Sequence, residues 1–474
     1  SIVTKGGSNA FHGSLYEYNR NTLFEANDWF NNRAGVARPA LVRNQYGGSI
    51  GGPILKNRLF FFYNWEGRKD RSATPKTATV PSESFKTGVV NVLLKSGQTV
   101  TMNSAAIAQV DPLHLGANPF ILGLMKQYPV GNNPLGASDK GLNFNQLLFN
   151  APNVLNNHAQ VAKLDYNLDS AGKHTLMVRG TLNGASSPPT GTAGLAQFPG
   201  QAASQTQLDN SRGLAGRYTA VLNAHTVNVF NYGYTRLGTA TTGTQNVIPS
   251  FGFTTLQPTT RPSSRIAPTH LLSDDITWTA GRHSVQGGFA FRYNENLRLA
   301  GNNQPSYSFS RNTLLGLGAD ISANVTTYMQ GLYGASASLA SATNVTNAFG
   351  ALFGMLNQYS ATFNYGIDGK AIPFGTSIAR DYISKSPEFY IQDSFKWKPN
   401  VTITAGLRYS IFGVPYEGNG VQVIPQTSLS QYFADRNGSQ SYGIPNFALP
   451  TSFITYKIGG PVNNGAGYYQ TDYK

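Results

Sequence analysis

Cysteine is absent from this chain of 474 residues, and charged residues are scarce. The lack of cysteine excludes disulfide bonds and thiolate metal sites. Charged residues make up 12% of the chain, about half the share usual in soluble proteins. No run approaches the about 18 consecutive apolar residues of a membrane-spanning helix. These absences exclude transmembrane helices and direct attention to large β structures.

Aromatic residues and glycine are abundant instead. The chain has 27 Phe, 25 Tyr and 51 Gly, yet its mean hydropathy is -0.26. Membrane barrels combine these properties because only every second strand residue is apolar. The net charge of +14 fits basic loops, and it also fits attraction to lipopolysaccharide, phospholipid or nucleic acid. Lys and Arg are scattered without a dense run, so we favour basic loops and expect no nucleic-acid partner.

Eleven segments alternate between apolar and polar residues and are bounded by turn residues, which predicts β-strands. Short corners near Lys56, Ser170, Ala224, Gly281 and Pro399 alternate with long connections. This alternation is typical of an up-and-down transmembrane barrel with tight turns at one end and extracellular loops at the other. The expected strands are 11–19, 45–53, 59–67, 158–168, 174–183, 213–222, 226–237, 271–279, 283–294, 389–397 and 401–412, and the expected loops are 20–44, 68–157, 184–212, 238–270, 295–388 and 413–474.

Side-chain parity predicts that one face of the sheet touches lipid and the other touches water. In the segment 283–294, Phe289 and Phe291 oppose Arg292. Either Asp274 or Asp275 must then find a partner or the lumen, because the two differ in parity. Candidates for facing a lumen or a plug are Glu66, Arg179, Arg217, Arg292 and Arg408.

The long connections contain further patterns. ANPFILGLMKQYP (117–129) and TNAFGALFGMLNQ (346–358) predict short helices, whereas 300–345, rich in Ser, Ala, Asn and Gly, predicts an ordered loop or flexible segment. Aromatic residues of these connections are candidates for contact with a bulky ligand, or for packing of loop on loop. They are Trp29, Phe30, Tyr307, Phe309, Tyr328 and Tyr333.

No motif predicts an enzyme. The sequence GGSIG at 47–51 fits the G-x-S-x-G pattern, but that elbow needs a following helix, and another strand follows here. The seven His show no metal-binding spacing. Carboxylate pairs such as Asp274 with Asp275 are interpreted as lumenal or turn residues rather than acid/base pairs. We therefore expect no catalytic residue, metal or cofactor.

Three stretches resemble TonB-dependent outer-membrane transporters, most closely the Oar-like (OmpA-related) branch. They are SIVTKGGSNAFHGSLYEYNRN, RNQYGGSIGGPILKNRLFFFYNWEGRKD and FYIQDSFKWKPNVTITAGLRYS. The resemblance implies that residues 1–10 end a plug domain and that 11–474 form the N-terminal half of a β-barrel. Such barrels have about 22 strands and a plugged lumen. The chain, whose N-terminus shows no signal-peptide pattern, is thus expected to be a fragment.

The resemblance also implies a function in the bacterial outer membrane. It implies uptake of a large or scarce solute, such as a glycan, a peptide or protein, or a chelate. Expected partners are outer-membrane lipid and lipopolysaccharide, the protein's own plug, an unknown solute, and a TonB-type complex acting through missing N-terminal segments. The alternative is a non-transporting surface protein for adhesion, export or assembly. A soluble β-rich binding protein or enzyme is a third possibility, which folding without detergent would reveal.

Overall fold

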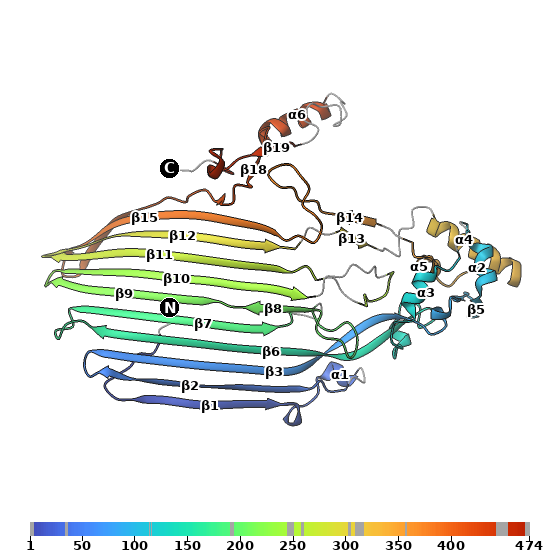
Figure 1. The fold of residues 1–474 in the computed structure, drawn as a ribbon, viewed down its shortest axis with the longest axis horizontal. Helices are drawn as coiled ribbons and strands as arrows, with labels where there is room; N and C mark the ends of the chain where they lie inside the picture. Colours follow the sequence, from blue (N-terminus) through green and yellow to red (C-terminus); the bar gives the residue numbers. More distant parts are fainter. Residues whose placement is uncertain are drawn as a thin grey trace.

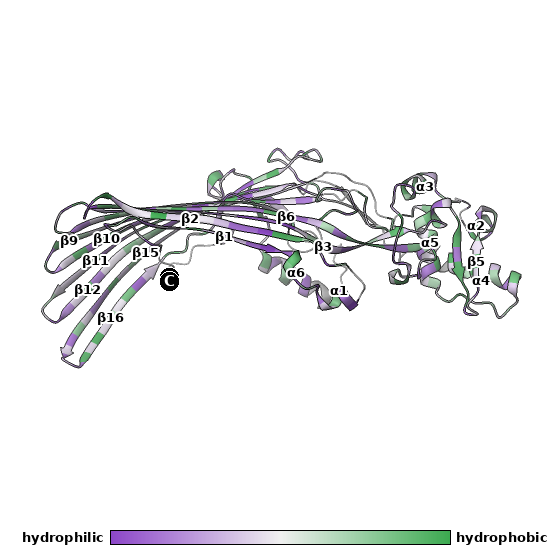
Figure 2. Cartoon of the chain, turned by 90° about the horizontal axis from the view of Figure 1, so that it is seen from below, coloured by the Kyte–Doolittle hydropathy of each residue, from purple (hydrophilic) through white to green (hydrophobic). Residues whose placement is uncertain are grey.

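The computed structural model describes residues 4–33, 37–112, 114, 116–189, 194–243, 251–256, 260–301, 305–308, 317–355, 358–441 and 454–469. Its largest element is a curved antiparallel sheet of 13 strands, with a smaller packed unit beyond one end (Figures 1 and 2). Eleven strands are long: β1 (His12–Asn21), β2 (Leu41–Leu55), β3 (Leu59–Pro81), β6 (Phe144–Asn167), β7 (His174–Ser187), β9 (Arg212–Asn223), β10 (Thr226–Gly243), β11 (Ser263–Ala280), β12 (His283–Ala300), β15 (Ile378–Lys398) and β16 (Val401–Ser410).

The long strands confirm the predicted set, and each pairs with its neighbours in chain order. Two short strands, β8 (Gln205–Asp209) and β17 (Tyr416–Glu417), complete the sheet. The short corners all lie at one end of it, at the left of Figure 1. Asn57, Gly172 and Gly281 adopt left-handed backbone there, with φ of 61°, 67° and 58°. Tight reversals of this kind are favoured at Gly and Asn.

The predicted loop bounds are wrong at the opposite end, where strands continue farther. β3 and β6 stay paired from Leu59 opposite Tyr166 to Pro81 opposite Phe144, well into the expected loop 68–157. β15 likewise begins at Ile378, inside the expected loop 295–388. The extension of β3 and β6 has its own physical cause, because Val80 and Phe144 are buried in a core beyond the sheet. Smaller extensions lengthen β2, β7, β10, β11 and β12.

The two faces of the sheet differ in polarity, as the parity of the strands predicts. Residues directly opposite each other in a sheet share a face, so the strand register assigns every position. One face, here called the apolar face, carries Leu15, Ile50, Phe61, Leu164, Val178, Tyr218, Phe230, Ile276, Phe289, Phe389 and Leu407, one from each long strand. The opposite face, here called the polar face, carries the five predicted lumenal residues. Leu407 is 73% exposed, so the apolar face covers no protein core.

The buried core lies instead in a separate unit, here called the cap, at the right of Figure 1. The long connections after β3, β7, β10 and β12 all contribute buried side chains to it, such as Phe85, Phe198, Phe253 and Phe349. The connections expected as loops at 68–157, 184–212, 238–270 and 295–388 therefore contribute to one packed module. Its elements include β4 (Val90–Leu93), β5 (Thr99–Met102), α2 (Ser104–Val110), α3 (Pro119–Met125), α4 (Leu317–Tyr333) and α5 (Ala342–Phe353).

Helix α4 corrects the prediction that 300–345 is a loop or flexible segment. Ile321, Val325 and Met329 recur every fourth residue and are 1%, 0% and 0% exposed, so one stripe of the helix enters the core. Small residues between them hid this stripe in the sequence. The helices predicted within 117–129 and 346–358 are confirmed as α3 and α5. Asn118 and Ser341 cap their N-termini.

Asp139 fastens the start of β6 to the cap. Its carboxylate accepts hydrogen bonds from the backbone N–H of Asn143 at 2.7 Å and of Phe144 at 3.1 Å. Burial raises the pKa of this carboxyl, although the N–H groups act in the opposite direction. The residue therefore fixes the point at which the cap chain re-enters the sheet.

The remaining elements are short. They are η1 (Thr22–Phe24), α1 (Trp29–Arg33), η2 (Phe85–Thr87), η3 (Pro134–Gly136), β13 (Pro305–Ser308), β14 (Gln358–Ala361), β18 (Val423–Pro425), α6 (Leu429–Ser441), β19 (Tyr456–Ile458) and η5 (Pro461–Asn463). Among the described residues, no helix has the length and apolar character to span a membrane.

Candidate functional site on the polar face of the sheet

The N-terminal segment, residues 4–10, runs along the polar face. Arg179 Nη1 donates a hydrogen bond to Thr4 Oγ1 at 3.1 Å. A Cβ atom added to Gly6 would lie 3.0 Å from Asp165 Oδ2. At the hairpin between β2 and β3, Asn9 Nδ2 donates to Asn57 Oδ1 at 2.6 Å. The segment therefore crosses from β7 to the β2–β3 corner before β1 begins.

Close packing of this segment depends on Gly7. A Cβ atom there would collide with the carbonyl oxygens of Phe61 and Gly52, which belong to two neighbouring strands. Backbone atoms cannot move aside without breaking the sheet, so glycine is required for this approach. The segment is thus fitted to the polar face rather than resting on it by a single contact.

A tyrosine bridges two non-adjacent strands at each side of the sheet. On β1, the Tyr16 hydroxyl donates to Glu66 Oε2 of β3 at 2.6 Å, across the intervening β2. A Cβ atom on Gly47 of β2 would lie 2.7 Å from the Tyr16 oxygen. The glycine therefore leaves the space through which Tyr16 reaches Glu66.

The second bridge repeats the arrangement. Tyr390 of β15 donates to Asp275 Oδ1 of β11 at 2.8 Å, across Gly288 of β12. The Arg408 guanidinium lies 5.2 Å from the centre of the Tyr390 ring, and its Nη1 is 3.0 Å from Glu388 Oε2. Ion pairing and cation–π contact thus extend the bridge to β16. The polar face is organised by connected polar groups over four strands here.

A Gly288→Ala substitution is expected to break the second bridge. Its Cβ atom would lie 2.5 Å from Asp275 Oδ1 and 2.6 Å from Tyr390 Cε1. Loss of the hydrogen bond to a carboxylate should lower the free energy of unfolding by about 1.5–3 kcal/mol. Urea unfolding of the protein in lipid vesicles measures this. Gly287→Ala is the matched control, because its Cβ would meet only Tyr390 O, at 3.6 Å. Equal losses in both variants would contradict the bridge.

Charges near the cap end of the polar face are also paired. Asp70 is 5% exposed and lies 2.9 Å from Arg43 Nη2 and 2.6 Å from Arg68 Nη2. A buried carboxylate needs such partners because desolvation otherwise disfavours its charge. Near the hairpin end of the same face, Lys163 and Asp165 form another pair at 3.0 Å. The polar face thus offers charged groups of both signs.

The five predicted lumenal residues all lie on the polar face but do not form one cluster. Glu66 accepts from Tyr16, Arg179 donates to Thr4, and Arg408 pairs with Glu388. Arg217 Nε donates to Asn231 Oδ1 at 2.8 Å. Arg292 stands opposite Leu271 and Ser386. Contact of these residues with a plug stays a prediction, with the Thr4 contact as its structural basis.

The predicted loop aromatics do not gather into one site. Trp29 and Phe30 are exposed and form an edge-on pair with ring centres 5.0 Å apart. Tyr328 packs against the cap core, which fits the loop-packing interpretation, whereas Tyr333 is exposed. The side chain of Tyr307 and the whole of Phe309 lie outside the described residues.

Sequence reasoning missed the role of Tyr16 and Tyr390, because their partners lie two strands away. It also left open which of two aspartates faces inward. Asp275 lies on the polar face, whereas Asp274 lies on the apolar face and accepts from Asn228 Nδ2 at 2.7 Å. Only the strand register reveals these relations.

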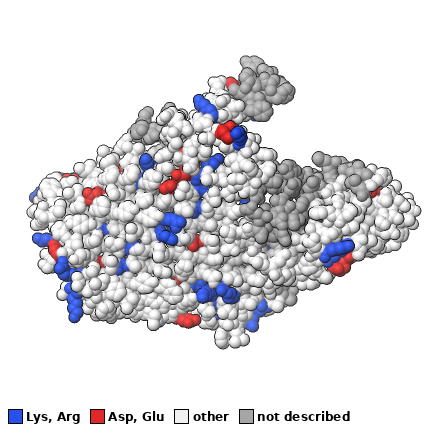
Figure 3. Space-filling view, viewed as in Figure 1, with Lys and Arg blue, Asp and Glu red and all other residues white. Residues whose placement is uncertain are grey.

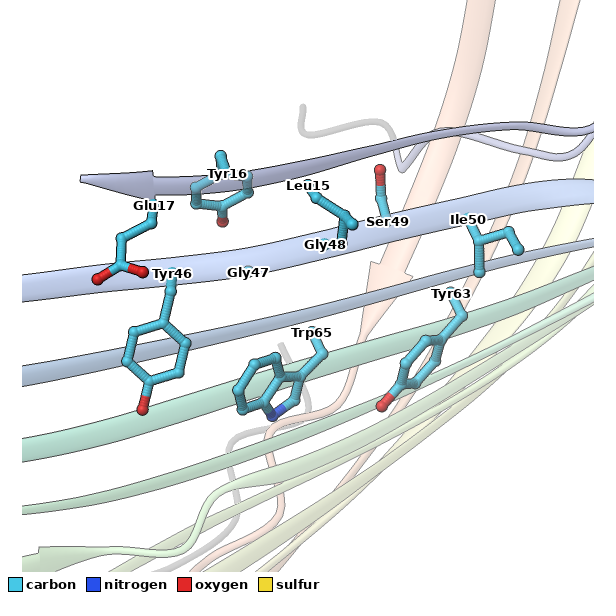
Figure 4. Close-up of a pocket in the computed structure, with 10 residues that line it drawn as sticks. All are labelled: Leu15, Tyr16, Glu17, Tyr46, Gly47, Gly48, Ser49, Ile50, Tyr63 and Trp65. Atoms are coloured by element: carbon cyan, nitrogen blue, oxygen red, sulfur yellow. The ribbon is translucent and has the colours of Figure 1, made fainter.

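Aromatic side chains from β2 and β3 line a hollow on the apolar face. Figure 4 shows Tyr46, Trp65 and Tyr63 in a row, and the first two rings have centres 5.5 Å apart. The row adds aromatic surface to the apolar face. The full lining is Leu15, Tyr16, Glu17, Tyr46, Gly47, Gly48, Ser49, Ile50, Tyr63 and Trp65.

No metal centre is seen in the part of the chain that the structure describes. No group of three or more His, Asp or Glu side chains there is placed to hold a metal ion. On the face shown in Figure 3, Lys and Arg lie singly or in small groups among uncharged residues. The candidate site is therefore the polar face itself, with its paired charges and seated N-terminal segment.

Comparisons with known proteins identify the class of this sheet. A family model described as "Outer membrane beta barrel domain" matches residues 3–474. No curated protein matches the chain. Among solved structures, the outer membrane transporter YddB from Escherichia coli is similar with a TM-score of 0.38 and 11% identity, covering 87% of this chain and 39% of that one.

A second similar structure is the ferric enterobactin receptor PfeA from Pseudomonas aeruginosa, in a mutant form bound to enterobactin. It has a TM-score of 0.37 and 10% identity, and the match covers 87% of this chain and 42% of that one. The chain spans about two fifths of the length of these structures.

Proposed function

Because this chain belongs to the outer membrane beta barrel domain family, we propose that it is part of a TonB-dependent receptor that takes up a large or scarce solute. The family is one of the bacterial outer membrane, and the apolar face of the sheet is the surface that meets lipid there. The solute is proposed to be a glycan, a peptide or protein, or a chelate. The protein's role is transport rather than catalysis.

The observation that carries this proposal is the N-terminal segment on the polar face. Residues 4–10 reach the sheet between Arg179 and the β2–β3 corner, on the side away from lipid. A plug domain inside a barrel must enter the first strand from this side. We therefore propose that residues 1–10 are the end of a plug and that 11–474 form the N-terminal half of the barrel.

The open edges of the sheet support the same division. β1 and β16 pair on one side only among the described residues. Unpaired N–H and C=O groups in lipid cost several kcal/mol each, so membrane-spanning sheets close into barrels. We propose that further strands pair with β1 and β16 in the intact barrel, and that its plug moves when a TonB-type complex pulls on segments ahead of Ser1.

An Arg179→Gln substitution tests whether the N-terminal segment is held by the polar face. The chain has no cysteine, so a single Lys5→Cys variant accepts one spin label without background. Loss of the guanidinium at Thr4 should raise the label's mobility several-fold in vesicles, because Lys5 adjoins Thr4, whose hydroxyl accepts from Arg179, whereas the contacts of Gly7 and Asn9 lie farther along the segment. Arg217→Gln, one strand away on the same face, is the control and should leave mobility unchanged. Unaltered mobility in the Arg179 variant would count against the seated segment.

The uptake function is tested genetically. Deleting the gene should abolish growth on one nutrient, and removing TonB should give the same defect, because the proposed import uses TonB-coupled energy. Restoring growth with the full-length gene is the control. Normal growth and uptake of all tested nutrients in both strains would contradict the receptor.

The cap favours a second function, that of a non-transporting surface protein. It is one packed module with its own core, and a packed module at the cell surface suits adhesion or assembly. Salt-dependent adhesion of cells that is lost with the gene and independent of TonB would support this alternative.

A further inference from the structure

Two arginines stand directly opposite each other on the apolar face. Arg212 begins β9 and is the register partner of Arg236 on β10. Each shares its face with apolar and aromatic residues, Leu214 beside Arg212 and Tyr234 beside Arg236. Like charges placed opposite each other on neighbouring strands repel. A counter-charge near both guanidinium groups relieves this repulsion.

The structure brings these guanidinium groups together without supplying that counter-charge. Arg212 Nε donates to Asn210 Oδ1 at 3.3 Å, and Arg236 Nη1 donates to the Asn210 backbone oxygen at 3.1 Å. Neither arginine forms an ion pair with a carboxylate among the described residues. The carboxylate of nearby Asp209 instead accepts from Ser211 N at 2.8 Å.

The height of the pair matches the outer boundary of the membrane. β10 starts beside its hairpin at Thr226, and Arg236 lies ten residues farther toward the cap. At about 3.3 Å per residue and a tilt of about 35–45°, this is roughly 25 Å along the membrane normal. The apolar band of such barrels has about that height. Phe230, Tyr232 and Tyr234 fill the band beneath Arg236.

A hollow adjoins Arg212 on the same face and combines polar and apolar walls. Leu182 stands opposite Arg212, and Gln160 stands opposite Leu182. The His158 ring lies over Gly184, where a Cβ atom would approach Nε2 to 2.5 Å. All of these residues line the hollow together with Asn210. An acyl chain can lie along the apolar wall while a phosphate meets the polar one.

Further basic residues continue the line on β3. Lys69 stands opposite Asn156, and Arg71 Nη1 donates to Asn156 Oδ1 at 3.1 Å. Asn156 also lines the hollow. In the direction from β10 toward β12, the nearest carboxylate level with Arg236 on this face is that of Glu295, which lies on β12, two strands away. Asp209 also lines the hollow, but the four basic side chains of Arg212, Arg236, Lys69 and Arg71 outnumber it, so the net charge of this surface is complementary to an anion.

We propose that Arg212 and Arg236, with the hollow beside them, bind a phosphate of a lipid in the outer leaflet of the outer membrane. The phosphate lies between the two guanidinium groups and removes their repulsion, and the acyl chains follow the apolar face toward the hairpin end. Charge-assisted hydrogen bonds from arginine to phosphate are strong and directional. The site depends on the membrane location of the chain and not on the proposed transport.

The test uses the full-length protein in detergent and lipopolysaccharide as the probe, with bound lipid counted by native mass spectrometry. The R212Q/R236Q variant is expected to bind lipopolysaccharide at least about tenfold more weakly than the wild type, since two charged contacts are lost. R217Q is the matched control, because Arg217 lies on the same strand but on the polar face. R212K/R236K keeps both charges and should retain most of the binding.

Two further arms identify the lipid phosphate as the ligand. Lipopolysaccharide stripped of its phosphates should bind the wild type as weakly as intact lipopolysaccharide binds the R212Q/R236Q variant. Inorganic phosphate at the same concentration should not displace the intact lipid. Three results would each overturn the proposal. The R212Q/R236Q variant could bind intact lipopolysaccharide as tightly as the wild type does, the wild type could bind the stripped lipid as tightly as the intact lipid, or inorganic phosphate could displace the intact lipid.

Discussion

A Phe349→Ala substitution is expected to loosen the whole cap while the sheet stays folded. The Phe349 side chain is 0% exposed, and its ring centre lies 5.6 Å from that of Phe353. Truncating a fully buried phenylalanine costs about 3–5 kcal/mol, because transfer energy is lost and a cavity remains. The cap core is shared by α2, α3, α4 and α5, so the loss is felt across the module.

Limited proteolysis of the protein in membranes measures this effect. Cleavage should appear within 82–143 and 317–355 in the variant, while the strand pairs remain protected by their hydrogen-bond ladders. Leu332→Ala is the matched control, since Leu332 lies on the cap helix α4 but is 54% exposed. Equal resistance of the Phe349 variant and the wild type would show that the cap has no common core.

The strands and the hairpin end could be predicted because the membrane imposes a simple rule on them. Where lipid touches one face, apolar residues must recur at every second position, and short turns carry Gly, Asn or Pro. Lys398 to Val401, for example, shows both the turn residues and the start of a clean alternation. Period and turn chemistry are local properties, so a single sequence displays them.

The cap could not be predicted because its core joins segments far apart in the chain. Val92, Phe198, Phe253 and Phe349 come from four different connections and meet only after the strands have placed them. Each segment alone contains a few apolar residues without a long period. Beyond the membrane, contact with lipid no longer requires apolar and polar residues to alternate. The alternation therefore did not predict the ends of β3 and β6 near the cap.

The candidate site was predictable only in part, for a related reason. Parity places Arg179 and Arg408 on the polar face correctly, since the strand period is local. The partners of Tyr16 and Tyr390 lie across an intervening strand, and a glycine on that strand permits each contact. A change of register by one residue would remove both bridges. Such pairs follow from the strand register, which alternation alone does not fix.

A Val178→Arg substitution is expected to destabilise the membrane-embedded sheet more than an arginine placed at the neighbouring position on the polar face. Val178 lies on the apolar face, with Leu164 opposite on one side and Gly216 on the other. It is the fifth residue of β7 after the hairpin, near the middle of the apolar band. An arginine at the bilayer midplane costs about 2–4 kcal/mol on the lipid face of a barrel. Urea titration of folding into lipid vesicles measures the loss.

Met177→Arg is the control that isolates lipid contact from strand disruption. Met177 is the preceding residue of the same strand, but it stands opposite Asp165 and Arg217 on the polar face. An arginine there meets water, the carboxylate of Asp165 and the like charge of Arg217. Because the attraction and the repulsion act in opposite directions at a solvated site, the cost should be under about 1 kcal/mol. A polar face buried in lipid would reverse the order of the two variants. Equal losses would mean that neither face touches hydrocarbon, and the assignment of the two faces would fail with it.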